Sequence, residues 1–264
     1  MDLKLENKLA LVSGSTAGIG FAIAKALAAE GTRVIINGRS DERVRKATEL
    51  LLGGAPSAKL ESLALDLSKP ENVARTAARF PDLDILVNNL GVYEPKPFEQ
   101  ITDEDWAAII ETNFMSGLRL SRQYLPRMKA MGWGRIIFIS SESAVNTPIE
   151  MIHYGVTKTM QVALARGLAE CCKATAVTVN SILAGPTRSE GVEGFIASMA
   201  KGGGVTPSEV EKEFFQKVRP NSLLQRFAAP EEVAALVAYV ASPLSSATNG
   251  AALRVEGGVV QSIL

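Results

Sequence analysis

The sequence predicts an α/β fold in which a doubly wound parallel sheet of about seven strands carries helices on both faces. Three observations support this. Short apolar, β-branched runs alternate with longer helical patterns about six times along the chain, as in parallel sheets covered on both sides. The first run leads through a glycine-rich turn into a helix, and no linker or second hydrophobic pattern follows. We therefore expect one Rossmann-like domain over residues 1–264.

The first half of the chain contains four strand patterns separated by three helical ones. The run LALVS indicates the first strand, and apolar residues at positions 19, 23, 26 and 27 indicate the first helix, because that spacing marks one helical face. The expected strands are 9–13, 33–37, 60–65 and 85–88, and the expected helices are 19–30, 41–52 and 70–79.

The second half continues the alternation but interrupts it once. The expected helices are 103–130, 151–173 and 230–241, and the expected strands are 135–140, 176–181 and 251–255. Residues 184–225, which we call the insert, mix helical signals with three consecutive glycines. Long inserts in compact domains are usually functional. Five apolar residues of the insert could close over a substrate as a lid, or simply pack against the domain: Phe195, Ile196, Met199, Phe214 and Phe215.

Composition excludes several classes of protein. The chain has 28 basic and 28 acidic residues, so no basic excess points to nucleic acid or to an anionic membrane surface. No apolar run approaches the ~18 residues of a membrane span, and the charged N-terminus MDLKLENK is not a signal peptide. Cys171 and Cys172 are adjacent, which fits a reducing, cytoplasmic compartment. We expect no metal site.

The turn after the first strand, SGSTAGIG, contains Gly14, Gly18 and Gly20. Glycines let the backbone turn sharply and approach a pyrophosphate, while the next helix points its first N–H groups at it. Ser15 and Thr16 can add hydroxyl donors. A plain turn is the alternative, but the position between a first strand and a first helix favours a nucleotide site.

Two features concern the adenosine half of a dinucleotide. The second strand ends in NGRS, where many NAD sites place an acid that holds the ribose. Here Gly38 leaves room and Arg39 offers a planar cation for a 2′-phosphate, which favours NADP(H) over NAD(H). Asp66 could accept a hydrogen bond from the adenine amino group. It could instead cap the helix that starts at residue 70, for which Ser68 is better placed.

The stretch HYGVTK places Tyr154 and Lys158 four residues apart on one helical face. This spacing alone is a weak signal, so its surroundings matter more. Ser141 follows the strand 135–140, at the carboxyl edge where parallel sheets bind ligands. A helix that begins shortly after this strand can bring Tyr154 beside Ser141.

Taken together, these motifs resemble the short-chain dehydrogenase/reductase family, in the single-domain type that includes 3-oxoacyl-[acyl-carrier-protein] reductases. SGSTAGIG is similar to the family's T-G-x-x-x-G-I-G, NNLG at 88–91 to N-N-A-G, and HYGVTK to Y-x-x-x-K. AGPTRSEG at 184–191 resembles the segment under the nicotinamide, and the match covers essentially the whole chain in order. The sequence departs from the pattern at Ser13, Leu90 and Ala184, and none of these changes removes a catalytic group.

The resemblance implies an oxidoreductase that moves a hydride between NADP(H) and a carbonyl or secondary alcohol. Tyr154 would be the general acid/base, and Lys158 would lower the tyrosine pKa by about 1–3 units and hold the nicotinamide ribose. Ser141 would orient the carbonyl oxygen, and Asn113 would kink its helix around a water that relays protons from Lys158. The implied cofactor-binding residues are Gly14, Ser15, Thr16, Gly18, Ile19, Gly20, Arg39, Asp66, Leu67, Asn89, Gly91, Tyr154, Lys158, Gly185, Pro186 and Thr187.

Two other function classes are weaker. A Ser-His-Asp hydrolase would need His153, the only histidine, but adjacent helical residues point ~100° apart, so His153 cannot share the face of Tyr154. A non-catalytic dinucleotide sensor or scaffold on the same fold is the stronger alternative. Such a protein could lose any member of the catalytic set, whereas all four members are present here.

The substrate and the assembly are less constrained by the sequence. A 3-oxoacyl thioester, a ketosteroid-like ring and a sugar-derived ketone all stay open as substrates. The resemblance implies a homo-oligomer, a dimer or a tetramer, that pairs through the helices at 103–130 and 150–173.

Overall fold

Seven strands form one sheet in the order β3-β2-β1-β4-β5-β6-β7, and every pairing is parallel. The computed structural model describes residues 1–263, apart from the side chain of residue 195. The strands are β1 (Leu9–Val12), β2 (Arg33–Gly38), β3 (Leu60–Ala64), β4 (Ile85–Asn88), β5 (Gly134–Ser141), β6 (Val177–Ala184) and β7 (Ala252–Val255). The principal helices are α1 (Gly18–Ala29), α2 (Asp41–Gly54), α3 (Pro70–Arg79), α4 (Asp103–Ile110), α5 (Ser116–Met131), α6 (Ile152–Glu170), α7 (Glu190–Gly203), α8 (Pro207–Lys217) and α9 (Pro230–Ala241). The predicted doubly wound α/β fold is confirmed.

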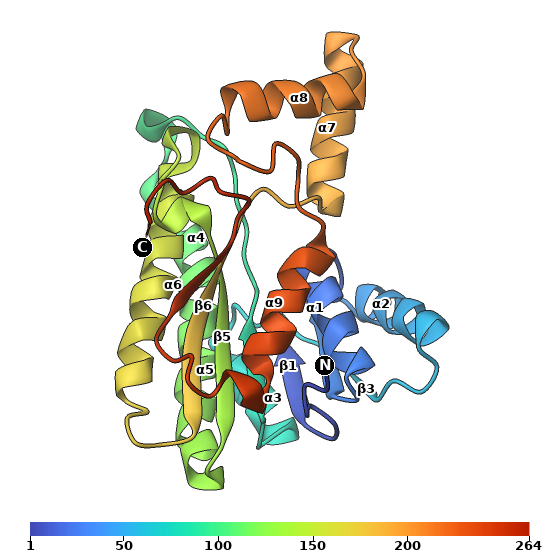
Figure 1. Ribbon diagram of the computed structural model, residues 1–264, viewed down its shortest axis with the longest axis vertical. Helices are drawn as coiled ribbons and strands as arrows, with labels where there is room; N and C mark the ends of the chain where they lie inside the picture. Colours follow the sequence, from blue (N-terminus) through green and yellow to red (C-terminus); the bar gives the residue numbers. More distant parts are fainter. Residues whose placement is uncertain (264) are drawn as a thin grey trace.

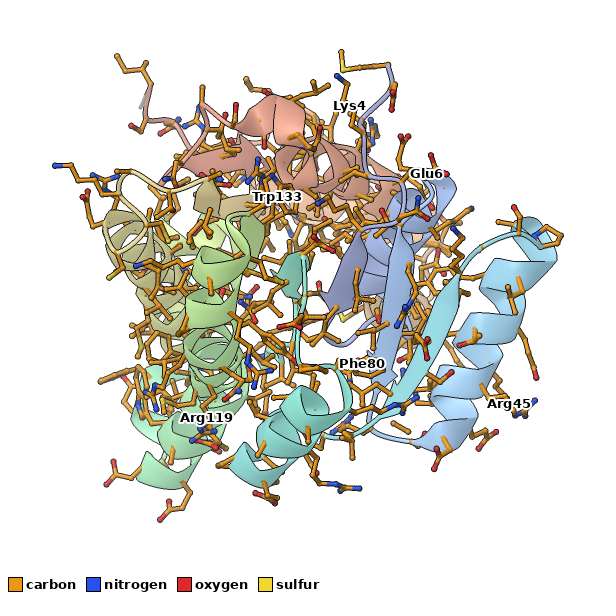
Figure 2. The ribbon with its side chains drawn as sticks, turned by 90° about the horizontal axis from the view of Figure 1, so that it is seen from below. Lys4, Glu6, Arg45, Phe80, Arg119 and Trp133 are labelled. Carbon is orange, nitrogen blue, oxygen red and sulfur yellow. The ribbon has the colours of Figure 1, made fainter. Side chains whose placement is uncertain are left out.

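Helices cover both faces of the sheet (Figure 1), and an apolar core fills the space on either side of it. One lies against α1, α2 and α9, and the other, which includes Phe80 of Figure 2, lies against α3, α5 and α6. Successive strand residues alternate between them: Ala10 and Val12 belong to the first core and Leu11 to the second. Burial on both faces explains why the strands read as nearly continuous apolar runs.

The sheet changes its direction of winding between β1 and β4, which are neighbours although β2 follows β1 in the chain. Asn89 follows β4, and its side-chain Nδ2 donates to Ser13 O at 2.9 Å and to Gly14 O at 3.1 Å. The Ser13 hydroxyl accepts from the backbone N–H groups of Asn89 and Leu90. Serine thus supplies the hydroxyl that threonine supplies in the family pattern. Ligands of open α/β sheets bind at such a switch point.

The helix expected over 103–130 is not continuous. A π-helical turn, Glu111–Met115, separates α4 from α5 and contains Asn113. A π turn inserts one residue into the helical ladder and often marks a functional position. The predicted helix 151–173 ends at Glu170, three residues earlier than expected.

The insert forms α7 and α8, which stand together beyond the carboxyl ends of the strands in Figure 1. Ile196 and Phe215 are buried in a separate apolar cluster with Ala200, Val210 and Phe227, and Phe214 packs against it. Met199 is exposed, and the side chain of Phe195 lies outside the described part of the structure. Phe214 and Phe215 therefore help to build a small separate core, to which Phe227 also contributes.

Among the residues that the structure describes, no helix combines the length and the apolar character that crossing a membrane requires.

Candidate functional site

A cleft of about 310 Å³ opens where α1 begins. Ala17 precedes α1 without a side-chain cap, and the first turn holds no acidic residue, so the positive end of the helix dipole faces the cleft. Gly14 and Gly18 have φ angles of 64° and 56°, which L side chains rarely adopt. These features fit the pyrophosphate of a dinucleotide. The cleft is lined by Gly14, Ala17, Gly18, Ile19, Gly20, Arg43, Asn89, Leu90, Gly91, Ser189, Glu190 and Gly191.

Of the two hydroxyl residues in the turn, Ser15 does not line this cleft. Ser15 is fully buried, and its Oγ accepts from the backbone N–H of Asn37 at 2.9 Å. Ser15 therefore joins the turn to β2, and the prediction that its hydroxyl donates to a phosphate is corrected. Thr16 is half-buried beside Gly38, where any side chain would overlap Thr16 Cγ2.

A second cation was missed by the sequence reasoning. Arg39 is exposed in the turn that precedes α2, and Arg43, one helical turn further on, lines the cleft. The available signal was the closeness of the two arginines in the sequence, since Arg39 lies just before α2 and Arg43 lies in its first turn.

Asp66 and Ser68 do not cap α3. The residue that precedes α3 is Lys69, which makes no side-chain cap. Instead, Asp66 Oδ1 accepts from the backbone N–H of Ser68 at 3.0 Å and from its hydroxyl at 2.7 Å, because a short acidic side chain readily bonds the chain two residues on. The Leu67 side chain is buried in the second core, so only its backbone is available to a ligand.

The segment that follows β6 is held close to the chain after β7. A Cβ at Gly185 would lie 2.5 Å from Glu256 O, so only glycine allows this approach. The Thr187 hydroxyl donates to Gly185 O at 2.9 Å, and Thr187 forms a parallel bridge with Ala228. Pro186 O accepts from the N–H of Ala228 at 2.9 Å. Ala184, where the family pattern has proline, is the last residue of β6.

The residues predicted as catalytic are brought together beside the cleft. Ser141 ends β5, and Tyr154 and Lys158 lie in the first two turns of α6. The Lys158 Nζ atom lies over the Tyr154 ring, 5.5 Å from its centroid, and donates to Ile139 O at 2.9 Å. A Cβ at Gly91, which lines the cleft, would lie 3.5 Å from Lys158 Nζ and 3.6 Å from Asn113 Oδ1. The cleft and the catalytic set therefore meet at Gly91.

Asn113 uses its side chain to hold the loop after β4. Its Oδ1 accepts from the N–H of Val92 at 2.8 Å, and its Nδ2 donates to Val92 O at 2.9 Å and to Thr157 Oγ1 at 3.1 Å. The backbone carbonyl of Asn113 accepts from Gln161 Nε2 at 2.6 Å. A carbonyl oxygen has two lone pairs, so this bond leaves one for a further donor.

A buried carboxylate next to Ser141 is the main feature that sequence reasoning missed. Glu142 is 4% exposed, and its Oε2 accepts from the Ser141 hydroxyl. Its Oε1 lies 3.1 Å from Nε of Arg219, which follows α8, and Nη1 of Arg219 lies 3.0 Å from Glu150 Oε1. The order SES placed Glu142 beside Ser141 in the sequence, but nothing in the pattern pointed to Arg219.

Burial and the neighbouring charges shift the pKa values of Tyr154 and Lys158. Burial raises the pKa of Tyr154, the Glu142 carboxylate raises it further, and a hydrogen bond from Ser141 opposes the rise. Burial lowers the pKa of Lys158 to about 8. Without a bound cofactor, burial is the largest influence on the pKa of Tyr154, and the expectation that Lys158 lowers this pKa stays a prediction.

Because Lys158 is buried, Lys158→Met is expected to raise the free energy of unfolding at pH 7 by about 1–3 kcal/mol. Below pH 8 the lysine is charged in both states, and only the folded state carries the desolvation cost. Between 8 and 10.5 the unfolded wild-type chain binds more protons, so wild-type stability rises with pH and the advantage of the variant fades. Urea denaturation at pH 7 and near pH 10 measures both effects. The matched control is Lys25→Met, at an exposed lysine of α1, and a variant that is less stable than wild type at pH 7 would contradict this account.

His153 turns away from the catalytic set, as expected from its position in the helix. Its side chain is buried, and its ring meets Trp106 of α4 edge to face, with centroids 6.0 Å apart. It therefore packs α6 against α4.

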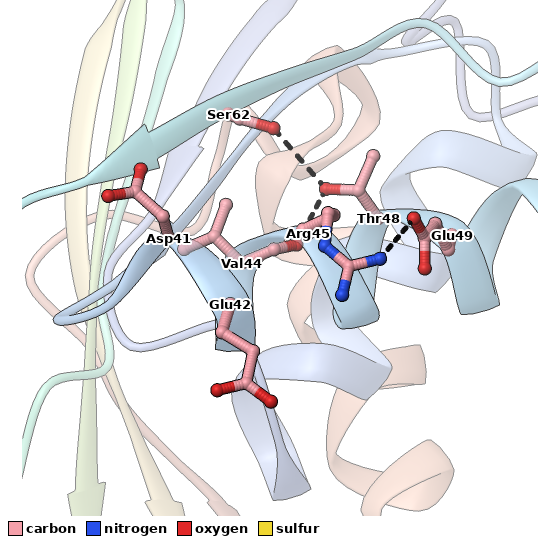
Figure 3. Close-up of a pocket in the computed structure, with 7 residues that line it drawn as sticks. All are labelled: Asp41, Glu42, Val44, Arg45, Thr48, Glu49 and Ser62. Atoms are coloured by element: carbon pink, nitrogen blue, oxygen red, sulfur yellow. Dashed lines mark hydrogen bonds and ion pairs between the residues drawn. The ribbon is translucent and has the colours of Figure 1, made fainter.

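A larger hollow of about 680 Å³ lies elsewhere, between the outer side of α2 and β3 (Figure 3). Thr48 contacts Ser62 there, and Arg45 pairs with Glu49 at 2.7 Å. None of the predicted site residues lines this hollow, so we do not assign the function to it. Within residues 1–263, no cluster of three or more His, Cys, Asp or Glu side chains could hold a metal ion.

Comparisons with known proteins show which proteins this chain resembles. A family model described as enoyl-(acyl carrier protein) reductase matches residues 14–260. The chain is 47% identical over 263 residues to the "Uncharacterized oxidoreductase YvaG" of Bacillus subtilis (strain 168), with 100% of both chains covered. It is 31% identical over 263 residues to the 3-oxoacyl-[acyl-carrier-protein] reductase FabG of Aquifex aeolicus (strain VF5), covering 98% of this chain and 100% of the relative. The crystal structure of L-sorbose reductase from Gluconobacter frateurii, complexed with NADPH and L-sorbose, superposes with a TM-score of 0.93 at 28% identity over 100% of both chains.

Proposed function

The chain belongs to the short-chain dehydrogenase/reductase family of oxidoreductases, and from this premise we propose that it transfers a hydride between NADP(H) and a carbonyl or secondary alcohol substrate. The observation that supports this most strongly is the meeting of two sites at Gly91. This glycine lines the cleft at the start of α1 and lies beside Lys158 Nζ and Asn113 Oδ1. A dinucleotide held in the cleft would thus extend to the catalytic set.

Tyr154 is the proposed general acid and base. In reduction its hydroxyl donates a proton to the carbonyl oxygen, and in oxidation the phenolate accepts one. Ser141, whose hydroxyl contacts Glu142 and accepts from the N–H of Ser143 at 3.1 Å, orients the carbonyl oxygen. Lys158 binds the nicotinamide ribose and holds a proton close to Tyr154. Asn113 fixes the loop at Val92, and its carbonyl is the proposed site of a relay water.

Bound NADPH supplies the hydride, and NADP⁺ accepts it in the reverse direction. The structure offers it an uncapped helix N-terminus, a glycine turn and two arginines, and these fit a phosphorylated dinucleotide. The Asn89 side chain holds the turn at Ser13 and Gly14. The residues proposed to bind the cofactor are Gly14, Thr16, Gly18, Ile19, Gly20, Arg39, Arg43, Asp66, Leu67, Asn89, Gly91, Tyr154, Lys158, Gly185, Pro186 and Thr187.

The direct test is an activity panel run with both nicotinamide cofactors. NADPH or NADH oxidation is followed at 340 nm with a 3-oxoacyl thioester, a ketose and a cyclic ketone, and the matching alcohols are tested in reverse. We expect NADPH-dependent turnover of at least one carbonyl compound. Tight NADPH binding without any turnover would instead support the non-catalytic sensor.

Arg39 is expected to set the preference for NADP(H). A hydrogen bond to a charged group contributes about 1.5–3 kcal/mol, so Arg39→Ala should lower the ratio of kcat/KM for NADPH over NADH by about 10- to 150-fold. The same ratio measured for Arg43→Ala shows whether the second arginine shares this role. The matched control is Arg45→Ala on the same helix, since Arg45 pairs with Glu49 outside the cleft. A wild-type chain with the higher kcat/KM for NADH would contradict this assignment.

A further inference from the structure

The guanidinium of Arg219 reaches the catalytic set from the far end of the insert. Arg219 lies two residues after α8, and its side chain is only 13% exposed. Its Nε lies 3.1 Å from Glu142 Oε1, and its Nη1 lies 3.0 Å from Glu150 Oε1. The backbone N–H of Arg219 donates to Phe214 O at 3.0 Å, so the arginine is fixed to the end of α8.

Glu142 joins this arginine to a catalytic hydroxyl. One carboxylate oxygen accepts from Ser141 Oγ, and the other binds Arg219. A carboxylate that is 4% exposed needs a countercharge, because an unpaired buried charge is strongly unfavourable. Arg219 is the one ion-pair partner of Glu142 among residues 1–263. The insert therefore supplies the countercharge of the buried Glu142 side chain beside Ser141.

Building on the function proposed above, we propose that Arg219 is a positioning residue through which the docked insert completes the catalytic site. With the insert docked, Arg219 holds and neutralises Glu142, so that Ser141 and Tyr154 can act on the carbonyl group. With the insert displaced, the Glu142 carboxylate loses the positive charge of Arg219 and lies unpaired beside the hydroxyls of Ser141 and Tyr154. Docking of the insert and completion of the active site therefore occur together.

The charges around Tyr154 give this role a measurable signature. Tyr154 is faced by Ser141 and Glu142 from the end of β5, by Tyr93 from the loop after β4 and by Arg219 from the insert. His153 and Lys158 belong to its own helix, and Glu150 precedes that helix. The Glu142 carboxylate raises the pKa of Tyr154, and the Arg219 charge lowers it. Loss of the arginine should therefore make the phenol harder to ionise.

The test is the pH dependence of kcat/KM for alcohol oxidation with NADP⁺, which needs the Tyr154 phenolate. Arg219→Met is expected to lower kcat/KM at pH 7 about tenfold or more and to move the rise in activity to higher pH, since one pKa unit is tenfold in ionised fraction. Glu142→Gln keeps an oxygen that can accept from Ser141 but removes the charge. In the Arg219→Met background it is expected to return the rise toward the wild-type pH and to recover most of the loss. A double variant no more active than Arg219→Met would overturn the proposal.

Two further variants distinguish the proposed effect of the Arg219 charge from a purely structural role. Arg219→Lys keeps the charge and is expected to keep the wild-type pH profile. Arg226→Met is the matched control: Arg226 also lies near α8 and binds Glu232 at 2.8 and 3.0 Å, but it makes no contact with Glu142. We expect Arg226→Met to retain the wild-type profile, and a shift equal to that of Arg219→Met would overturn the proposal.

Limited proteolysis of the full chain gives a readout that needs no turnover. Arg219→Met is expected to speed cleavage within residues 190–217 several-fold, whereas Arg226→Met should not. If the wild-type chain reduced no carbonyl compound, the proposed function would fail while this measurement still tested the docking role. If the wild type were active and Arg219→Met matched it in pH profile and cleavage, the role of Arg219 would fail and the function would stand.

Discussion

A chain carrying Tyr154→Phe is expected to fold and still bind NADPH, and to lose carbonyl reduction by about 10²–10⁴-fold. The phenylalanine keeps the ring that faces Tyr93, with centroids 6.2 Å apart in the wild type, and the ring beneath Lys158 Nζ. Only the hydroxyl that transfers the proton is lost. Fluorescence titration of NADPH and steady-state rates with the best substrate of the panel measure the two quantities on one sample.

The matched control for this variant is Tyr239→Phe. Tyr239 lies on α9 and is 38% exposed, on an element that contributes nothing to the catalytic set. Its variant should keep wild-type turnover and affinity. Full turnover in Tyr154→Phe would remove the general acid from the mechanism, and the non-catalytic function would then have to be reconsidered.

The raised pKa of Tyr154 also bears on how this residue acts. In the polypeptide itself the hydroxyl is protonated throughout the neutral range, because burial and Glu142 both raise its pKa. In that state the hydroxyl can donate the proton that carbonyl reduction needs. Oxidation needs the phenolate and therefore a compensating positive charge. Arg219 supplies such a charge within the chain, and the positive nicotinamide of NADP⁺ would supply another.

The parts of the fold that were predictable depend on neighbours in the sequence. Strand β5 was visible because RIIFIS is apolar on both faces, and each face meets a separate core. Tyr154 and Lys158 were visible because a helix fixes the geometry of residues four apart. The π turn at Asn113 was not visible in the apolar pattern, and only the family resemblance implied a kink at this residue.

The site features that were missed depend on contacts across the chain. Glu142 and Arg219 are 77 residues apart, and no local pattern states which arginine of the insert reaches a buried carboxylate. The same limit applies to Ser15, whose hydroxyl was expected at the cleft but bonds Asn37 of β2. Its environment depends on how closely the turn packs on the neighbouring strand.

Gly20→Ala is expected to weaken NADPH binding by about 10²-fold, because the turn can no longer present its N–H groups to the pyrophosphate and contacts to charged groups contribute about 1.5–3 kcal/mol each. Gly20 lies in the first turn of α1, and alanine suits a helix better than glycine does. The expected loss therefore arises from space alone. A Cβ at this position would overlap Asn89 Nδ2 and would lie 2.5 Å from Gly14 O, so Gly14 or Asn89 would have to move.

Gly53→Ala is the control that isolates this cause. Gly53 also lies in a helix, α2, but a Cβ there would meet no atom within 4 Å. This variant should bind NADPH like the wild type and gain about 0.5–1 kcal/mol of stability from the helix propensity of alanine. Thermal denaturation of both variants shows whether Gly20→Ala still folds. A folded Gly20→Ala chain with wild-type affinity for NADPH would mean that the pyrophosphate does not lie against this turn, and the cofactor would then have to be placed elsewhere along the switch point.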